Sequence, residues 1–118
     1  MKESILKVKS YLFALKVIKV CQLIVKEHKE FIISKQFLKA GTAIGALVRE
    51  AEFAQSKPDF ISKLSIALKE ANESDYWISL LKDSGYITIE TALDLDEQNK
   101  EIIRLLVSSI KTLKTVKN

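Results

Sequence analysis

Glycine and proline are scarce in this chain, and that scarcity limits the folds it can adopt. Three glycines and one proline occur in 118 residues. An all-β fold would need a turn signal every ~8–12 residues. Residues 2–29 contain neither glycine nor proline, so long helices are the expected elements. The length predicts a single domain, residues 1–118, and excludes two.

Apolar residues recur at helical spacing in the first half of the chain. The first helix is expected over residues 2–29, and its core stripe comprises Leu6, Phe13, Ala14, Val17, Val20, Cys21 and Ile24. The second helix is expected to begin near Ser34, which would be its N-cap, and to end near Gln55. Its core stripe comprises Phe37, Gly41, Ile44 and Val48.

The second half of the chain predicts two more helices. Ser56, Pro58 and Asp59 form a helix start, and Gly85 is the residue expected to end that helix after about residue 84. Its core residues are Phe60, Leu64, Ala67, Ala71 and Ile78. The β-branched run 86–91 has no second strand to pair with, so a connection or a short turn of helix is expected there. Asp94 or Asp96 would then cap a fourth helix, whose buried stripe comprises Ile102, Leu105, Leu106, Ser109, Ile110 and Leu113.

Four helices with short connections predict an all-α, up-down-up-down antiparallel four-helix bundle. Gly41 and Gly45 would allow another helix of the bundle to approach the second one closely.

A second line of residues lies beside the core stripe on two of the predicted helices. It comprises Gln36, Lys39, Ala43, Leu47 and Glu50 on the second helix, and Ile66, Glu70, Glu73, Trp77 and Leu80 on the third. One interpretation buries the carboxylates against Lys39 or another cation, and another makes the line a subunit interface anchored by Trp77; the two can hold together. The alternative is that Trp77 is ordinary core and the acids point to solvent.

No catalytic, metal or cofactor site is expected. A di-iron bundle needs a Glu-x-x-His motif from each of two helices, and the one histidine, His28, lies near the end of the first helix. Cys21 lies on the apolar stripe, so we expect it to be an inert core thiol. A single free cysteine fits a reducing compartment, so the cytoplasm is expected. Lys16 and Lys19 interrupt the most apolar stretch, so neither a signal peptide nor a membrane span is expected.

Positive charge is concentrated toward both ends of the sequence. The net charge is +4. In an antiparallel bundle the start of the first helix meets the end of the fourth, which would gather Lys2, Lys7, Lys9, Lys111, Lys114 and Lys117. That cluster predicts binding to RNA or DNA phosphates, and the alternative is a solvated lysine surface. No aromatic residues accompany the cluster, so base stacking is not expected.

Two stretches resemble a known family. They are residues 36–51, QFLKAGTAIGALVREA, and residues 59–77, DFISKLSIALKEANESDYW. They resemble the four-helix-bundle proteins encoded in intervening sequences of bacterial 23S ribosomal RNA genes, which are similar to the accessory variability determinant of diversity-generating retroelements. The resemblance implies a ring-like homopentamer with a basic surface and, for the retroelement members, binding to a reverse transcriptase and to nucleic acid. Lys39, Ala43 and Leu47 stand where the family has Arg, Ser and Asn, which makes the second line more apolar and favours an interface.

The sequence therefore leaves two alternative functions. The first is a non-enzymatic oligomeric module that binds nucleic acid, with oligomer contacts at Gln36, Lys39, Leu47, Glu50, Ile66, Glu70, Glu73 and Trp77. The second is a structural or protein-interaction bundle with no nucleic-acid role.

Overall fold

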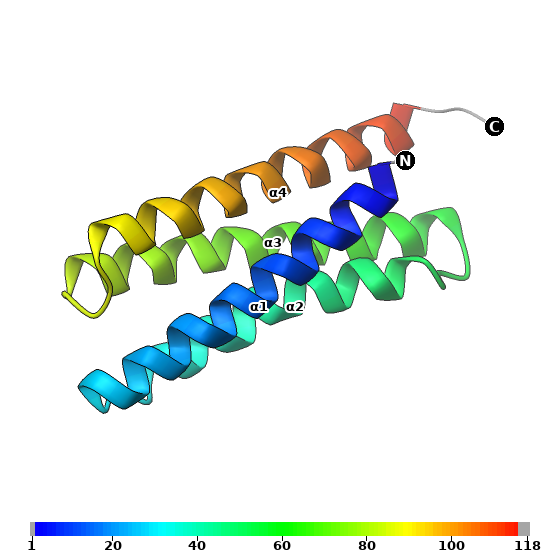
Figure 1. The fold of residues 1–118 in the computed structure, drawn as a ribbon. Coiled ribbons are helices and arrows are strands. Elements are labelled where there is room, and N and C mark those ends of the chain that lie inside the picture. Colours follow the sequence, from blue (N-terminus) through cyan, green and yellow to red (C-terminus); the bar gives the residue numbers. More distant parts are fainter. Residues whose placement is uncertain (1, 116–118) are drawn as a thin grey trace.

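The computed structural model describes residues 2–115 of the chain, and they form four helices. These are α1 (Lys2–His28), α2 (Ile33–Ala51), α3 (Lys57–Asp83) and α4 (Ile89–Thr115). Contacts join α1 to α2, α2 to α3, α3 to α4 and α1 to α4 (Figure 1). The start of α1 and the end of α4 lie at one end of a bundle 53 Å long, which we call the termini end. The predicted four-helix bundle is confirmed.

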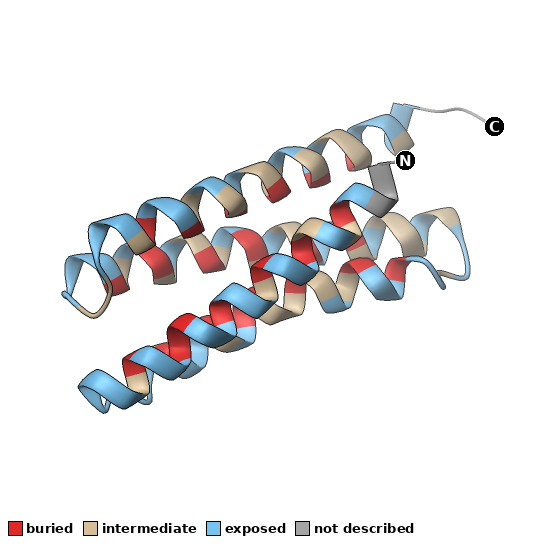
Figure 2. Cartoon of the chain, in the orientation of Figure 1, coloured by how far each residue is buried: buried red, intermediate tan, exposed pale blue. Residues whose placement is uncertain are grey.

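The buried residues follow the predicted stripes closely (Figure 2). Ala14 and Phe60 are half-buried, whereas every other predicted core residue of the first three helices is buried. In α4 the core is shifted toward the start of the helix. Leu105, Ser109 and Leu113 are only half-buried, and the buried residues are Ala92, Leu95, Asn99, Ile102, Leu106 and Ile110.

The two ends of α3 lie where the sequence predicts them. The Ser56 hydroxyl accepts a hydrogen bond from the Asp59 N–H at 3.1 Å, which caps the start of α3. Gly85 has φ +82°, a left-handed conformation that costs glycine little because it has no Cβ. The 86–91 run forms a short connection and the first residues of α4.

Two predicted helix caps are wrong. Ser34 lies inside α2, and the Glu30 carboxylate serves that helix instead, accepting hydrogen bonds from the N–H groups of Ile32, Ile33 and Ser34 at 2.8–2.9 Å. The carboxylate reaches three donors at once, whereas a serine hydroxyl reaches one or two. The helix also ends at Ala51 and not near Gln55.

The second wrong cap belongs to α4, whose start is also earlier than predicted. This helix begins five residues before Asp94, at Ile89, and the Thr88 hydroxyl accepts from the Thr91 N–H at 3.1 Å. Threonine therefore caps the helix in place of Asp94 or Asp96.

The predicted close approach at the two glycines is present between α2 and α1. A Cβ on Gly41 would lie 2.8 and 2.9 Å from the two methyl carbons of Val17, and one on Gly45 would lie 3.3 Å from the Ser10 carbonyl oxygen. Within residues 2–115, no helix is both long and apolar enough to cross a membrane.

Candidate functional site

Cys21 and His28, whose side-chain types often act in catalysis in other proteins, have structural surroundings here. Cys21 is buried, and its thiol donates to the Ser34 carbonyl at 3.3 Å. Burial, with a smaller contribution from Glu30, raises the pKa of this thiol to about 12, so it carries no thiolate near neutral pH. His28 ends α1, and its ring meets the Tyr86 ring edge-on at 5.3 Å. Among the described residues, no three His, Cys, Asp or Glu side chains group as metal ligands.

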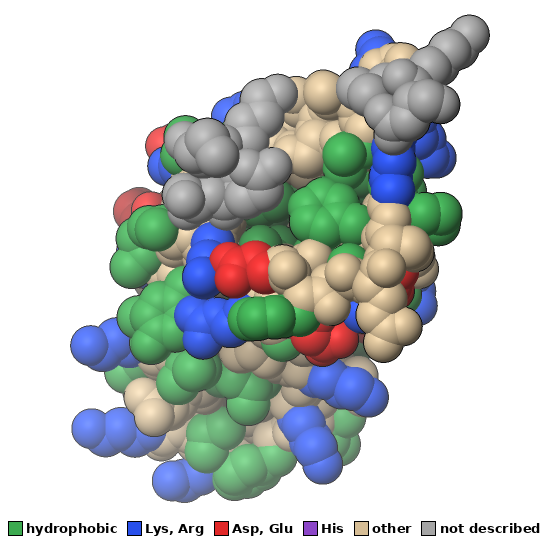
Figure 3. All heavy atoms as spheres, turned by 90° about the vertical axis from the view of Figure 1, so that its right-hand side faces the viewer, with side chains coloured by type: hydrophobic (Ala, Val, Ile, Leu, Met, Phe, Trp, Pro, Cys, Tyr) green, Lys and Arg blue, Asp and Glu red, His purple; other side chains and the backbone are tan. Residues whose placement is uncertain are grey.

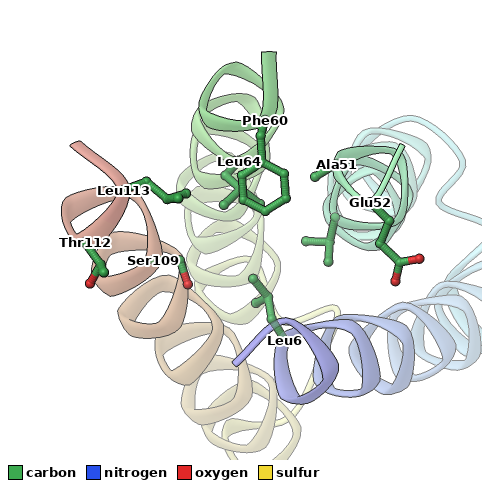
Figure 4. A pocket seen from close by; sticks show the side chains of 9 residues that line it. Leu6, Ala51, Glu52, Phe60, Leu64, Ser109, Thr112 and Leu113 are labelled. Atoms are coloured by element: carbon green, nitrogen blue, oxygen red, sulfur yellow. The ribbon is translucent and has the colours of Figure 1, made fainter. Parts of the chain in front are cut away.

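A small cavity lies at the termini end (Figure 4). Its volume is about 100 Å³, and Leu6, Phe60, Leu64 and Leu113 are among its lining residues. Pockets that hold small-molecule ligands usually measure ~300–1,000 Å³. This cavity is the loosely filled end of the hydrophobic core.

The second line of residues is mostly half-buried within the single chain. Gln36, Lys39 and Glu50 are exposed and Leu47 is half-buried on α2, whereas on α3 Ile66 is 41% exposed and Glu70, Glu73, Trp77 and Leu80 are half-buried. The Trp77 indole N–H donates to the Glu73 carboxylate at 3.4 Å. No ion pair between described residues links Lys39 to Glu70 or Glu73. Their role in a subunit interface stays a prediction.

A larger apolar surface covers the side of α1 that faces away from the core, and the sequence reasoning missed it. We call it the outer face of α1, and its exposed residues are Val8, Tyr11, Leu12, Leu15 and Ile18. It borders a groove of about 560 Å³ between α1 and α2. The sequence did hold a signal, because positions 8, 11, 12, 15 and 18 repeat at helical spacing on the side opposite the core stripe.

The lysines predicted to cluster at the termini end are partly neutralised. Lys7 pairs with Glu52 at 2.6 Å and Lys9 pairs with Glu101 at 3.2 Å. Lys111 and Lys114 are exposed, whereas the Lys2 side chain and Lys117 lie outside the residues that the structure describes. Viewed from this end, the Lys and Arg side chains are dispersed over the face, with hydrophobic and acidic groups between them (Figure 3).

Uncompensated positive charge gathers instead on α1 and α2. Residues 1–52 contain ten Lys or Arg and five Asp or Glu, whereas residues 53–118 contain nine and ten. On α1, α2 and the connection between them, five exposed lysines belong to no ion pair found within residues 5–115, namely Lys19, Lys26, Lys29, Lys35 and Lys39. They lie along the second half of α1, the α1–α2 connection and the first turns of α2.

The local carboxylates do little to offset these lysines. Burial opposes ionisation of Glu30, but hydrogen bonds from the N–H groups of Ile33, Ser34 and Ile32 outweigh it and lower the pKa of Glu30. Its carboxylate is therefore charged but turned to the start of α2. Glu27 is the other acid of this segment and is exposed. Among the charged side chains around the α1–α2 connection, ammonium groups therefore outnumber carboxylates.

Comparison with known proteins agrees with this architecture. The family model of the 23S rRNA-intervening sequence protein matches residues 2–108. A crystal structure from Bacteroides thetaiotaomicron, described as a protein with unknown function from the S23 ribosomal protein family, is 50% identical and superposes with a TM-score of 0.92, covering 94% of this chain and 99% of that chain. A search of curated proteins found no match. The chain therefore belongs to the family of 23S rRNA-intervening sequence proteins.

Proposed function

We propose that this chain is a non-enzymatic subunit of a homo-oligomer that binds RNA or DNA through its basic surface. The observation that carries the proposal is the group of five exposed lysines on α1 and α2 without ion-pair partners among the described residues. Phosphates bound there would release condensed counterions, which makes such binding steeply salt-dependent and nearly independent of sequence. The single buried thiol fits the cytoplasmic location expected for such a protein.

Filter binding at low salt tests the nucleic-acid part. We expect retention of both labelled RNA and labelled DNA of unrelated sequences, with retention decreasing as salt is added. If neither RNA nor DNA is retained at low salt, this function is rejected.

The occupant proposed for the outer face of α1 is a second copy of the chain. Contiguous exposed apolar surface of this kind usually marks an interaction site. The α3–α4 part of another copy would be complementary, because residues 53–118 carry one more acid than base and expose Ile89 and Leu93. Five subunits are proposed only because the family resemblance implies a pentamer.

Light scattering on matched variants distinguishes the two candidate interfaces. Leu15, on the outer face, is 47% exposed and Ile66, on the second line, is 41% exposed. We expect a wild-type mass well above 13.4 kDa, reduced by Leu15→Gln and unchanged by Ile66→Gln. The reverse pattern would move the interface to the second line, and a wild-type mass near 13.4 kDa would reject the oligomer.

The second candidate function is a protein-interaction bundle, which the apolar outer face of α1 also favours. In that case a pull-down would recover a protein partner, and neutralising the lysines would leave the interaction intact. A reverse transcriptase as that partner stays a prediction of the family resemblance.

A further inference from the structure

A second groove lies beside the α1–α2 connection, and we call it the hairpin groove. Its volume is about 670 Å³, and its lining includes Ile18, Gln22 and Lys26 from α1 and Phe31, Lys35 and Leu38 from the connection and α2. This volume is within the ~300–1,000 Å³ of typical ligand pockets. The hairpin groove is therefore large enough to take an organic group of the size of a nucleotide.

An aromatic ring and several cations meet at this groove. Phe31 is 58% exposed although it is large and apolar. Lys26 and Lys35 line the groove, are exposed, and take part in no ion pair that the described residues form. Lys29 is close by, because its ammonium donates to the Lys26 carbonyl at 3.5 Å. One site thus offers a flat apolar surface beside positive charge.

That combination matches the chemistry of an unpaired nucleotide. Bases of a single strand stack on aromatic rings while the neighbouring phosphates bind cationic side chains. In a duplex the faces of the bases are already covered by their neighbours, so a duplex could use only the lysines. The start of α2 contributes no anion site of its own, because the Glu30 carboxylate occupies its first N–H groups.

We propose that the hairpin groove binds single-stranded nucleic acid, with a base stacked on Phe31 and adjoining phosphates held by Lys26 and Lys35. This inference rests on the proposed nucleic-acid function and specifies its location and the form of the ligand. It also places a base-stacking residue where the sequence predicted none.

Fluorescence anisotropy with labelled oligo(dT) and a labelled DNA duplex tests the proposal on the full chain. The variants are Phe31→Leu, the double variant Lys26→Gln/Lys35→Gln, and Lys111→Gln/Lys114→Gln as a control that removes the same charge at the termini end. All substituted side chains are exposed, so we expect unchanged melting temperatures.

Phe31→Leu is expected to weaken oligo(dT) binding by about 5- to 150-fold and to leave duplex binding unchanged. The groove double variant should weaken both ligands and lower the oligo(dT) salt slope by about 1.4 units, since each phosphate contact contributes ~0.7 on single strands. The control should change oligo(dT) binding less than the groove double variant does.

Three results would overturn the inference while leaving nucleic-acid binding in place. They are wild-type affinity of Phe31→Leu for oligo(dT), an equal loss from the control and the groove double variant, or a change of oligomer mass caused by Phe31→Leu, which would make the groove a subunit contact. If the wild-type chain binds neither ligand at low salt, the proposed function fails as well.

Discussion

Replacing Gly41 with alanine should destabilise the bundle, although alanine is the better helix former. The new Cβ would lie 2.8 and 2.9 Å from the two γ-carbons of Val17, which is fully buried and, as a β-branched residue, stiff in its rotamer. Overpacking of this kind costs ~1–3 kcal/mol, against a propensity gain of about 1 kcal/mol. Because two contacts are too short at once, we expect a net loss of about 1–2 kcal/mol in the free energy of unfolding.

The same substitution should become favourable once Val17 is replaced by alanine. Val17→Ala alone should cost about 2–3 kcal/mol through lost burial and a cavity. In that background the two closest γ-carbons are gone and the nearest remaining side-chain atom is the Cβ of position 17, 3.3 Å from the new Cβ, so Gly41→Ala should stabilise by up to about 1 kcal/mol. Urea unfolding followed by circular dichroism, at one fixed protein concentration, measures all four proteins of this double-mutant cycle. An equal effect of Gly41→Ala in both backgrounds would refute the packing argument.

Three further predictions concern individual polar groups. Glu30→Ala should lower the free energy of unfolding by about 1 kcal/mol at neutral pH. Because the pKa of Glu30 in the folded protein is lowered from 4.5, the difference in melting temperature from wild type should shrink as pH falls through that lowered pKa. A difference that does not change with pH would contradict the capping role. Burial and then the Asp96 carboxylate raise the pKa of Asp75, so the contribution of Asp75 to stability is present below pH 3.8 and is lost as pH rises through the raised pKa. Asp75→Asn should therefore raise the melting temperature at neutral pH but not in acid. A lower melting temperature at neutral pH would count against an unfavourable Asp75 carboxylate beside Asp96. Asn99 is fully buried; its Nδ2 donates to the Ala71 carbonyl at 2.9 Å, but its Oδ1 has no hydrogen-bond partner among the described residues. Because burying an unpaired oxygen costs more than one hydrogen bond contributes, Asn99→Leu should raise the urea midpoint by an amount equivalent to about 1 kcal/mol, and a lower midpoint would show that the hydrogen bond to Ala71 is needed.

Local patterns in the sequence were sufficient for most of the fold. Helical periodicity depends on residues three and four apart, and Ser56 and Gly85 act on their immediate neighbours, so these features could be predicted without knowing the tertiary arrangement. Glu30 also acts locally, but a carboxylate that caps from outside the helix was not distinguishable in sequence from a solvated acid.

The surfaces could be predicted less well because they depend on distant residues. Lys7 and Lys9 looked free in sequence, yet Glu52 and Glu101 come from other helices to pair with them. Leu15 lies opposite the core stripe in sequence, but only the packing of α2 and α4 against the other sides of α1 shows that neither of these helices covers it. Phe31 was likewise an isolated aromatic residue until the α1–α2 connection set it beside Lys26 and Lys35.

The salt dependence of RNA binding tests the central claim most directly. The association constant of a labelled single-stranded RNA would be measured across a salt series from about 50 to about 200 mM. Engagement of at least three of the unpaired lysines predicts a linear decrease of the logarithm of this constant with the logarithm of salt concentration, with a slope of about −2 or steeper. An undetectable association constant at the lowest salt, or one that does not change across the series, would contradict the account.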